Sequence, residues 1–217
     1  MALSMSDSSE TRRVLQRASA GDQAGWGELL ARHRDRLKRM VALRLDRRLQ
    51  GRIDPSDVIQ ESYLEAATRL AEYLQNPSMP FFLWLRFLTG QKLLELHRHH
   101  LGTQMRDAER DISLYRGTLP ATSSAALAAQ LLGHATRPSE AAMRAEMKIR
   151  LQEALNGMDP LDREVLALRH FEQLSNAETA KVLGLQESAA SKRYVRALRR
   201  LKEILMNMPG GMGELWP

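Results

Sequence analysis

A run of basic residues near the carboxyl-terminal end is the strongest chemical signal in this sequence. Between positions 188 and 202 there are six basic residues and no acidic one. Apolar residues recur through the same stretch at helical spacing, namely Tyr194, Ala197, Leu198, Leu201 and Leu205. A helix of this kind can bury one side on its own domain and turn the other toward phosphates and base edges. A nucleic-acid-binding helix is therefore favoured over a solvated basic helix in a bundle.

The residues just before this helix predict a second helix and a tight turn. Ser175 can cap its amino terminus, and Glu178, three residues later, completes a capping box. Gly184 can end it, because glycine adopts the left-handed conformation at little cost. Together the two segments predict a helix-turn-helix over 174–205.

A second candidate is the predicted helix over 54–70, DPSDVIQESYLEAATRL. Four polar residues share one side of it, namely Asp57, Gln60, Glu61 and Glu65. Val58, Ile59 and Leu64 are expected on the packed side. The acidic side suits a basic helix of a partner protein, and a solvated surface is the alternative.

A third candidate is the segment 81–102, FFLWLRFLTGQKLLELHRHHLG. Its aromatic start, including Trp84, is expected mainly in the core. Amide and basic groups follow, and together with aromatic residues such groups suit single-stranded DNA. The candidates here are Gln91, Lys92, Arg98 and His99, followed by Glu95, Arg106 and Arg110 around the helix end.

No pattern in the sequence predicts catalysis or a metal site. His97 and His100 have i, i+3 spacing, but only Glu95 stands nearby as a third ligand, so we expect no metal. His33, His134 and His170 are isolated. There is no phosphate-binding glycine loop and no nucleophile elbow. We therefore expect neither an enzyme nor a cofactor.

Composition favours a DNA-binding, all-α protein. The 217 residues carry a net charge of +6, with a pI near 10.0, which suits a polyanionic partner. Alanine, leucine and arginine abound, and aromatic residues make up 5%. The absence of cysteine excludes disulfides, and no apolar run is long enough for a signal peptide or a membrane span. We expect a cytoplasmic protein without membrane contact.

Punctuating residues divide the chain into two helical blocks. Helices are predicted from about 8 to 20, 22 to 49, 54 to 76 and 80 to 102 in the first block, and from 140 to 155 and from 159 to 171 before the helix-turn-helix. Residues 113–139 are rich in Pro, Gly, Ser, Thr and Ala, which indicates a flexible linker, with a short helix over 125–132. The predicted parts are 1–21, 22–112, 113–139, 140–207 and a tail, 208–217.

These motifs, in this order, resemble bacterial sigma factors of the sigma-70 family. The helix-turn-helix matches the pattern LSxxEIAxxLGxSxxTVxxRxxRAxxxLR of their region 4 at Leu174, Ser175, Glu178, Ala180, Leu183, Gly184, Arg193, Arg196, Ala197 and Leu201. Their region 2 pattern D-[VI]-x-Q-[ED]-x-[FY]-[LIV] is matched by Asp57, Val58, Gln60, Glu61, Tyr63 and Leu64. A following pattern, F-x-x-W-L-x-x-[IL]-x-x-N, is matched at Trp84, Leu85 and Leu88, with Gln91 in place of Asn. The size and layout resemble the extracytoplasmic-function (ECF) type.

The resemblance implies a factor that binds core RNA polymerase and directs promoter recognition and DNA melting. It implies contact with the clamp of the largest subunit through Asp57, Gln60 and Glu61, and with the flap of the second-largest subunit. The downstream (−10) element would meet Gln91, Lys92, Arg98 and His99. The upstream (−35) element would meet Ser191, Lys192, Arg193, Val195, Arg196 and Arg200, with Arg193 and Arg200 at phosphates. An anti-sigma factor is a further implied partner. The alternatives are a free-standing helix-turn-helix regulator and a helical adaptor without a DNA role.

Overall fold

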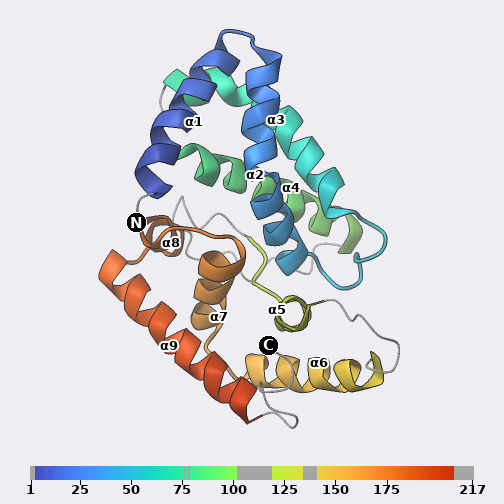
Figure 1. Cartoon of the computed structure of the whole chain (residues 1–217). Helices are drawn as coiled ribbons and strands as arrows, with labels where there is room; N and C mark the ends of the chain where they lie inside the picture. Colours follow the sequence, from blue (N-terminus) through green and yellow to red (C-terminus); the bar gives the residue numbers. More distant parts are fainter. Residues whose placement is uncertain (1–2, 76, 78, 102–118, 134–140, 208–217) are drawn as a thin grey trace. The chain divides into compact units, whose positions relative to one another are not determined.

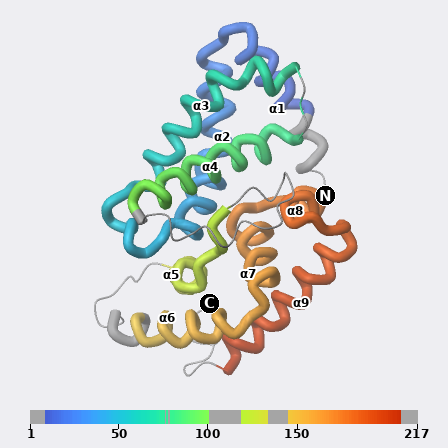
Figure 2. The backbone as a smooth tube through the Cα atoms, turned by 180° about the vertical axis from the view of Figure 1, so that it is seen from behind, coloured from blue at the N-terminus to red at the C-terminus, as the bar shows by residue number. Residues whose placement is uncertain are grey.

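The chain folds into two compact units that divide between Leu119 and Pro120. The computed structural model describes residues 3–75, 77, 79–101, 119–133 and 141–207. The described residues form helices and no β-strand (Figures 1 and 2). An isolated β-bridge joins Gln50 and Ile53. The all-α prediction is confirmed. Within the described ranges, no helix is both long and apolar enough to cross a membrane.

The first unit contains α1 (Leu3–Ser19), α2 (Gln23–Arg44), α3 (Pro55–Gln75) and α4 (Phe81–Leu101). Helix α2 packs against each of the other three, and α3 packs along α4 (Figure 1). The fully buried side chains come from α2, α3 and α4, and they include Leu29, Leu37, Met40, Ile59, Leu85, Leu88 and Leu93. The aromatic start of α4 also lies in this core, as expected: Trp84 is 9% exposed and stacks on Tyr73.

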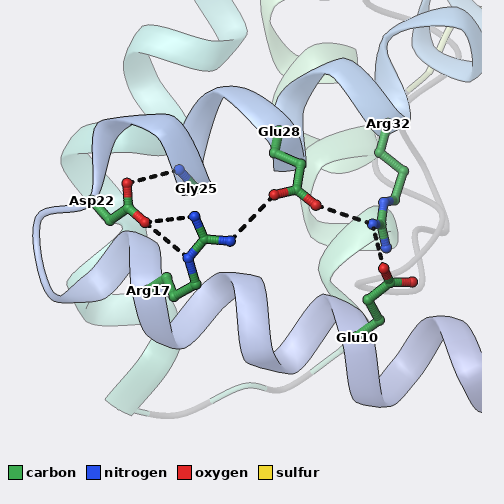
Figure 3. Close-up of polar contacts among 6 residues, drawn as sticks. All are labelled: Glu10, Arg17, Asp22, Gly25, Glu28 and Arg32. Atoms are coloured by element: carbon green, nitrogen blue, oxygen red, sulfur yellow. Dashed lines mark hydrogen bonds and ion pairs between the residues drawn. The ribbon is translucent and has the colours of Figure 1, made fainter.

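The turn between α1 and α2 is fixed by polar groups (Figure 3). Asp22 is the N-cap of α2 and accepts a 3.0 Å hydrogen bond from the Gly25 amide, so the predicted helix start is confirmed. Arg17 of α1 donates to the same carboxylate from Nε at 2.9 Å and pairs with Glu28 at 3.3 Å. Arg32 joins Glu28 to Glu10, again linking the two helices. Because these ion pairs are largely exposed, each adds little to stability.

Helix α2 ends at Arg44, five residues earlier than the sequence analysis predicted. Leu45 is buried in an extended conformation, and a turn follows. The Asp46 carboxylate accepts bonds from both the Arg48 amide, at 2.9 Å, and the Arg48 guanidinium, at 3.0 Å. Aspartate competes with the helix in this way by bonding a backbone amide two residues on. The apolar pattern continues to Leu49, which is buried, and this explains the longer prediction.

The second unit contains α5 (Ser124–Leu132), α6 (Ala141–Asn156), α7 (Pro160–Leu166), a π-helical turn (Ala167–Phe171), α8 (Asn176–Leu183) and α9 (Glu187–Met206). Figure 2 shows α7, α8 and α9 from behind. Helix α5 is the short helix predicted inside 113–139, and it packs against α6. Its apolar side is buried through Leu127, which faces a core that includes Leu151, Leu155 and Leu166.

Candidate functional site

The helix-turn-helix forms as its sequence predicts. The Ser175 hydroxyl accepts from the Glu178 amide at 3.1 Å, and the Glu178 carboxylate accepts from the Ser175 amide at 2.7 Å. Gly184 ends α8 with a φ of 64°, in the left-handed region. The Leu185 amide then donates to the Ala180 carbonyl at 2.9 Å and closes the turn. The capping box and the glycine terminus are therefore both confirmed.

Helix α9 is turned slightly away from the predicted orientation. Its buried residues are Ala190, Ala197 and Ile204, which repeat every seven residues along one side. Leu198 was expected on the packed side but is 37% exposed, so that part of the prediction is wrong. Helix α9 packs on α7 and α8 with Ala190 and Ala197 buried, whereas Leu198 lies outside this buried side.

The outward side of α9 carries most of the residues predicted to read DNA. Ser191, Lys192 and Val195 are exposed, and Val195 is 44% exposed although it is apolar. Arg199 is also exposed and follows Lys192 by seven residues, so it projects from the same side. The sequence analysis counted Arg199 as basic but did not assign it to the site. The described helix thus presents a row of cations beside a small apolar patch.

Arg193 and Arg196 form ion pairs within the second unit. Arg193 Nη1 lies 2.9 Å from Asp162 Oδ1 of α7. Arg196 donates to the same carboxylate through Nε, at 3.0 Å to Oδ2, and through Nη2, at 2.8 Å to Oδ1. Arg200 pairs more locally, with Glu203 one turn further along at 3.1 Å. The Asp162 contact could not be predicted from local patterns, because Asp162 lies 31 and 34 positions before the two arginines.

Asp162 stays ionised although it is buried. Burial by itself raises the pKa of this carboxyl group, but hydrogen bonds and charges from Arg196 and Arg193 outweigh it and leave the pKa below its usual value. The same contact raises the pKa of Arg196. The three charges therefore persist together at neutral pH and join the start of α7 to the middle of α9.

On the first unit, α3 exposes the residues predicted to contact polymerase. Asp57, Gln60 and Glu61 are all exposed, while Val58 and Ile59 are buried at 2% exposure. Leu64 was expected on the packed side, but it is 65% exposed, so that prediction is wrong. It lies at i+7 from Asp57 and i+4 from Gln60, which places it on the same side. We call these four residues the α3 docking face.

Glu65, the fourth polar residue of the predicted stripe, faces α4 instead. It pairs with Lys92 of α4 at 3.1 Å, and Glu95 holds the same ammonium at 3.0 Å. Hydrogen bonds and charges from Glu95 and Glu65 raise the pKa of Lys92. Lys92, predicted to contact DNA, is thus also an internal link between α3 and α4, with a side chain 24% exposed.

Three other residues of α4 were predicted to contact the downstream element, namely Gln91, Arg98 and His99. Arg98 and His99 are exposed in the last turn, and Gln91 is half-buried two turns earlier. Spacings of seven and eight residues put Arg98 and His99 on the side of Gln91. Arg106 and Arg110 lie outside the described residues.

The histidines of α4 do not gather around a common point. His97 is buried, and its Nε2 accepts a hydrogen bond from the Asp46 amide at 3.3 Å. Burial lowers the pKa of His97. His100 is exposed, with its ring 5.0 Å from that of His99. Over the described ranges, no group of three histidine, aspartate or glutamate side chains is placed to hold a metal ion.

Known proteins resemble the chain in both its parts. Residues 148–201 match the family model described as "Sigma-70, region 4", which covers the helix-turn-helix. BldN of Streptomyces coelicolor, an ECF RNA polymerase sigma factor, is 24% identical over 200 residues, 92% of this chain and 67% of BldN. CnrH, an RNA polymerase sigma factor of Cupriavidus metallidurans, is 29% identical over 197 residues, 89% of this chain and 93% of CnrH.

A solved structure and a further relative also match nearly the whole chain. The structure of CnrH in complex with the cytosolic domain of CnrY superimposes with a TM-score of 0.52 at 25% identity, covering 90% of this chain and 97% of CnrH. The ECF RNA polymerase sigma factor SigD of Mycobacterium tuberculosis is 30% identical over 193 residues, 89% of this chain and 82% of SigD. The chain therefore belongs to the ECF RNA polymerase sigma factors of the sigma-70 family.

Proposed function

We propose that this sigma factor binds its partners through three surfaces. The α3 docking face binds polymerase, the end of α4 binds melted DNA, and the outward side of α9 binds duplex DNA. Members of the family are transcription initiation factors that bind core RNA polymerase and direct it to promoters. Because the chain belongs to this family, we prefer a sigma factor to the two alternatives, a free-standing helix-turn-helix regulator and a helical adaptor without a DNA role. The observation that most supports DNA reading is the exposed row of cations on α9 of a capped helix-turn-helix.

The α3 docking face combines two acids, an amide and one apolar side chain. Interfaces of this kind take specificity from the charged rim and affinity from a desolvated centre. Leu64, with 65% of its surface exposed, supplies that centre, and Asp57 and Glu61 surround it with negative charge. The expected partner surface is basic with an apolar pocket, on the clamp of the largest polymerase subunit.

Co-elution with core polymerase tests this assignment. The double variant Gln60→Ala, Glu61→Lys should lower affinity by at least tenfold, because it removes an acid and places a cation against a basic surface. Leu64→Ala should lower it separately, with no loss of thermal stability, because the side chain is exposed. Glu72→Lys makes the same charge change on the same helix, about three turns beyond Glu61. Wild-type affinity in the double variant would reject the α3 docking face.

The end of α4 is assigned to the melted strand of the downstream element. Arg98 and His99 are exposed, and the amide of Gln91 lies on the same side. Lys92 is assigned mainly to holding α4 on α3, since two carboxylates already bind its ammonium. Backbone charge contacts and base capture offset the cost of unstacking DNA.

Permanganate reactivity of thymines in the promoter bubble tests the α4 assignment. The variant Arg98→Ala, His99→Ala should reduce reactivity while closed binding to duplex promoter stays unchanged. His100→Ala, which removes an exposed neighbouring histidine, serves as the control. Full reactivity in the double variant would contradict the assignment.

The proposal extends to location and regulation. We place the protein in the cytoplasm, where bacterial polymerase and DNA lie, and assign it no catalytic step. CnrH was solved in complex with the cytosolic domain of CnrY. By analogy, a membrane-tethered or soluble inhibitor that covers the DNA-reading or docking surfaces is the proposed form of control.

A further inference from the structure

Asp162 of α7 is the feature of the second unit that the proposed function leaves unused. Its residue surface is 5% exposed, and both carboxylate oxygens point at α9. Three guanidinium donors reach it within 3.0 Å: one from Arg193 and two from Arg196. A buried carboxylate that binds two cations of a recognition helix constrains how that helix meets DNA.

The geometry of the Arg196 contact is specific to one edge of the guanidinium. Nε and Nη2 form the side edge of the group, and both are used by Asp162. A guanidinium carries five N–H donors in a fixed plane, so the terminal edge formed by Nη1 and the second Nη2 hydrogen keeps its donors. The side chain of Arg196 is 59% exposed, whereas that of Asp162 is 7% exposed. The carboxylate thus occupies the side edge of the guanidinium, and more than half of the Arg196 side chain remains exposed to solvent.

We infer that Asp162 is a positioning residue for promoter reading: it holds Arg196 by its side edge and presents the terminal edge to a guanine of the upstream element. This inference rests on the proposed role of α9. Two parallel N–H donors of an arginine match the O6 and N7 acceptors of guanine in the major groove. An unrestrained arginine would lose rotamer freedom on binding, and the Asp162 contact removes much of that loss beforehand.

Arg193 binds the same carboxylate, at the Oδ1 atom that Arg196 Nη2 also contacts. It contacts Oδ1 only, through Nη1 at 2.9 Å, and its side chain is 29% exposed. Asp159 lies 3.8 Å from the same nitrogen. Arg193 therefore neutralises the buried carboxylate and is assigned to positioning rather than to the phosphate contact first expected for it.

Arg200 supplies a matched comparison on the same helix. It pairs with Glu203, but both side chains are 60% exposed and the pair lies within one turn of α9. Breaking that pair frees an arginine without touching α7. Glu203→Gln is therefore the control for Asp162→Asn, since each replaces a carboxylate by the amide of the same shape.

The test is selection of a randomised upstream-element library by holoenzyme reconstituted from core polymerase and the full chain. Wild type should prefer guanine at one base pair by about 5- to 150-fold, the discrimination typical of a two-bond arginine contact. Arg196→Ala should abolish that preference. Asp162→Asn should reduce it at least fivefold at the same base pair and leave the other positions unchanged. Glu203→Gln should leave every base preference as in wild type.

The outcomes separate the inference from the function on which it rests. Full wild-type preference in Asp162→Asn, at the base pair that Arg196→Ala loses, overturns the positioning role and leaves Arg196 as a reader. Unchanged preferences in Arg196→Ala overturn both assignments for Arg196. Failure of wild-type holoenzyme to select any element refutes the proposed function itself. If Asp162→Asn melts below the assay temperature, Asp162→Glu is tested instead. Its longer side chain moves the carboxylate and so displaces the Arg196 guanidinium, and the same fivefold reduction is expected.

Discussion

His33 on α2 is a buried histidine whose ring has no hydrogen-bond partner among the described residues. It is 7% exposed, and neither Nδ1 nor Nε2 is satisfied. The ring lies 5.3 Å from that of Phe82 and 5.8 Å from that of Phe81, between centroids. Desolvation, helped by the charges of Arg36 and Arg32, lowers the pKa of His33 to about 4. The first unit should therefore lose stability as the pH falls.

The sign and size of this effect follow from proton binding. Between pH 6.5 and 4 the unfolded chain binds a proton at His33 while the folded chain does not, so stability falls as pH falls. The depressed pKa of His33 predicts that going from pH 7.5 to 5 costs about 2 kcal/mol, with a limit of about 3 kcal/mol below pH 4. His33→Leu removes the buried titrating group and should flatten the curve by that amount. At pH 7.5 the variant should be at least as stable as wild type, because no unsatisfied nitrogen remains buried.

Denaturant unfolding at a series of pH values measures this. Trp26 and Trp84 belong to the same aromatic group as Phe81, so tryptophan fluorescence follows the first unit when the third tryptophan, Trp216, is replaced by phenylalanine in every variant. His97, whose pKa is also lowered by burial, adds a slope of the same sign to both proteins and cancels in the comparison. The exposed His100→Gln is the control for replacing a histidine of the first unit. Parallel curves for wild type and His33→Leu would show that His33 does not cause the loss of stability at low pH.

Three further predictions concern the elements that hold the sites. Ser175→Ala removes the N-cap of α8 and should cost about 1 kcal/mol in thermal or denaturant unfolding of the second unit; an unchanged midpoint would contradict the capping role. Gly184→Ala forces a side chain into the left-handed region at the helix-turn-helix and should cost about 1–2 kcal/mol, measured in the same way, with Gly27→Ala, inside α2, as the opposite case that should not destabilise. Lys92→Ala should destabilise the first unit by roughly 1 kcal/mol, because it breaks the partly buried ion pair with Glu65 that joins α4 to α3. Arg98→Ala should leave the unfolding midpoint unchanged, because Arg98 is exposed. Equal effects of the two variants would mean that Lys92 has no structural role different from that of Arg98.

Local signals in the sequence were sufficient to predict most of the fold. Ser175, Glu178 and Gly184 define α8 because caps and left-handed glycines depend on neighbours within a few positions. The start of α2 at Asp22 was predicted for the same reason, because this N-cap bonds the amide of Gly25, three positions on. The buried Trp84 followed from its size and its apolar neighbours.

Contacts between distant residues could not be predicted in this way. Asp162 is an ordinary acid in its own helix, and only the packing of α7 on α9 brings it to Arg196. Glu65 shares a helical side with Asp57 in the sequence pattern, yet α4 supplies Lys92 and draws it inward. Leu64 and Leu198 were assigned to the packed sides of their helices from apolar character and helical position, but the packing of neighbouring helices leaves both exposed.

We propose above all that this chain directs core RNA polymerase to promoters through the outward side of α9. Mapping of transcript starts on bacterial genomic DNA, with core polymerase alone and with the purified chain added, tests it most directly. We expect new starts that share one upstream duplex element, and loss of those starts when Lys192 and Arg199 are both replaced by alanine. No new starts, or starts that persist in the Lys192→Ala, Arg199→Ala variant, would contradict it.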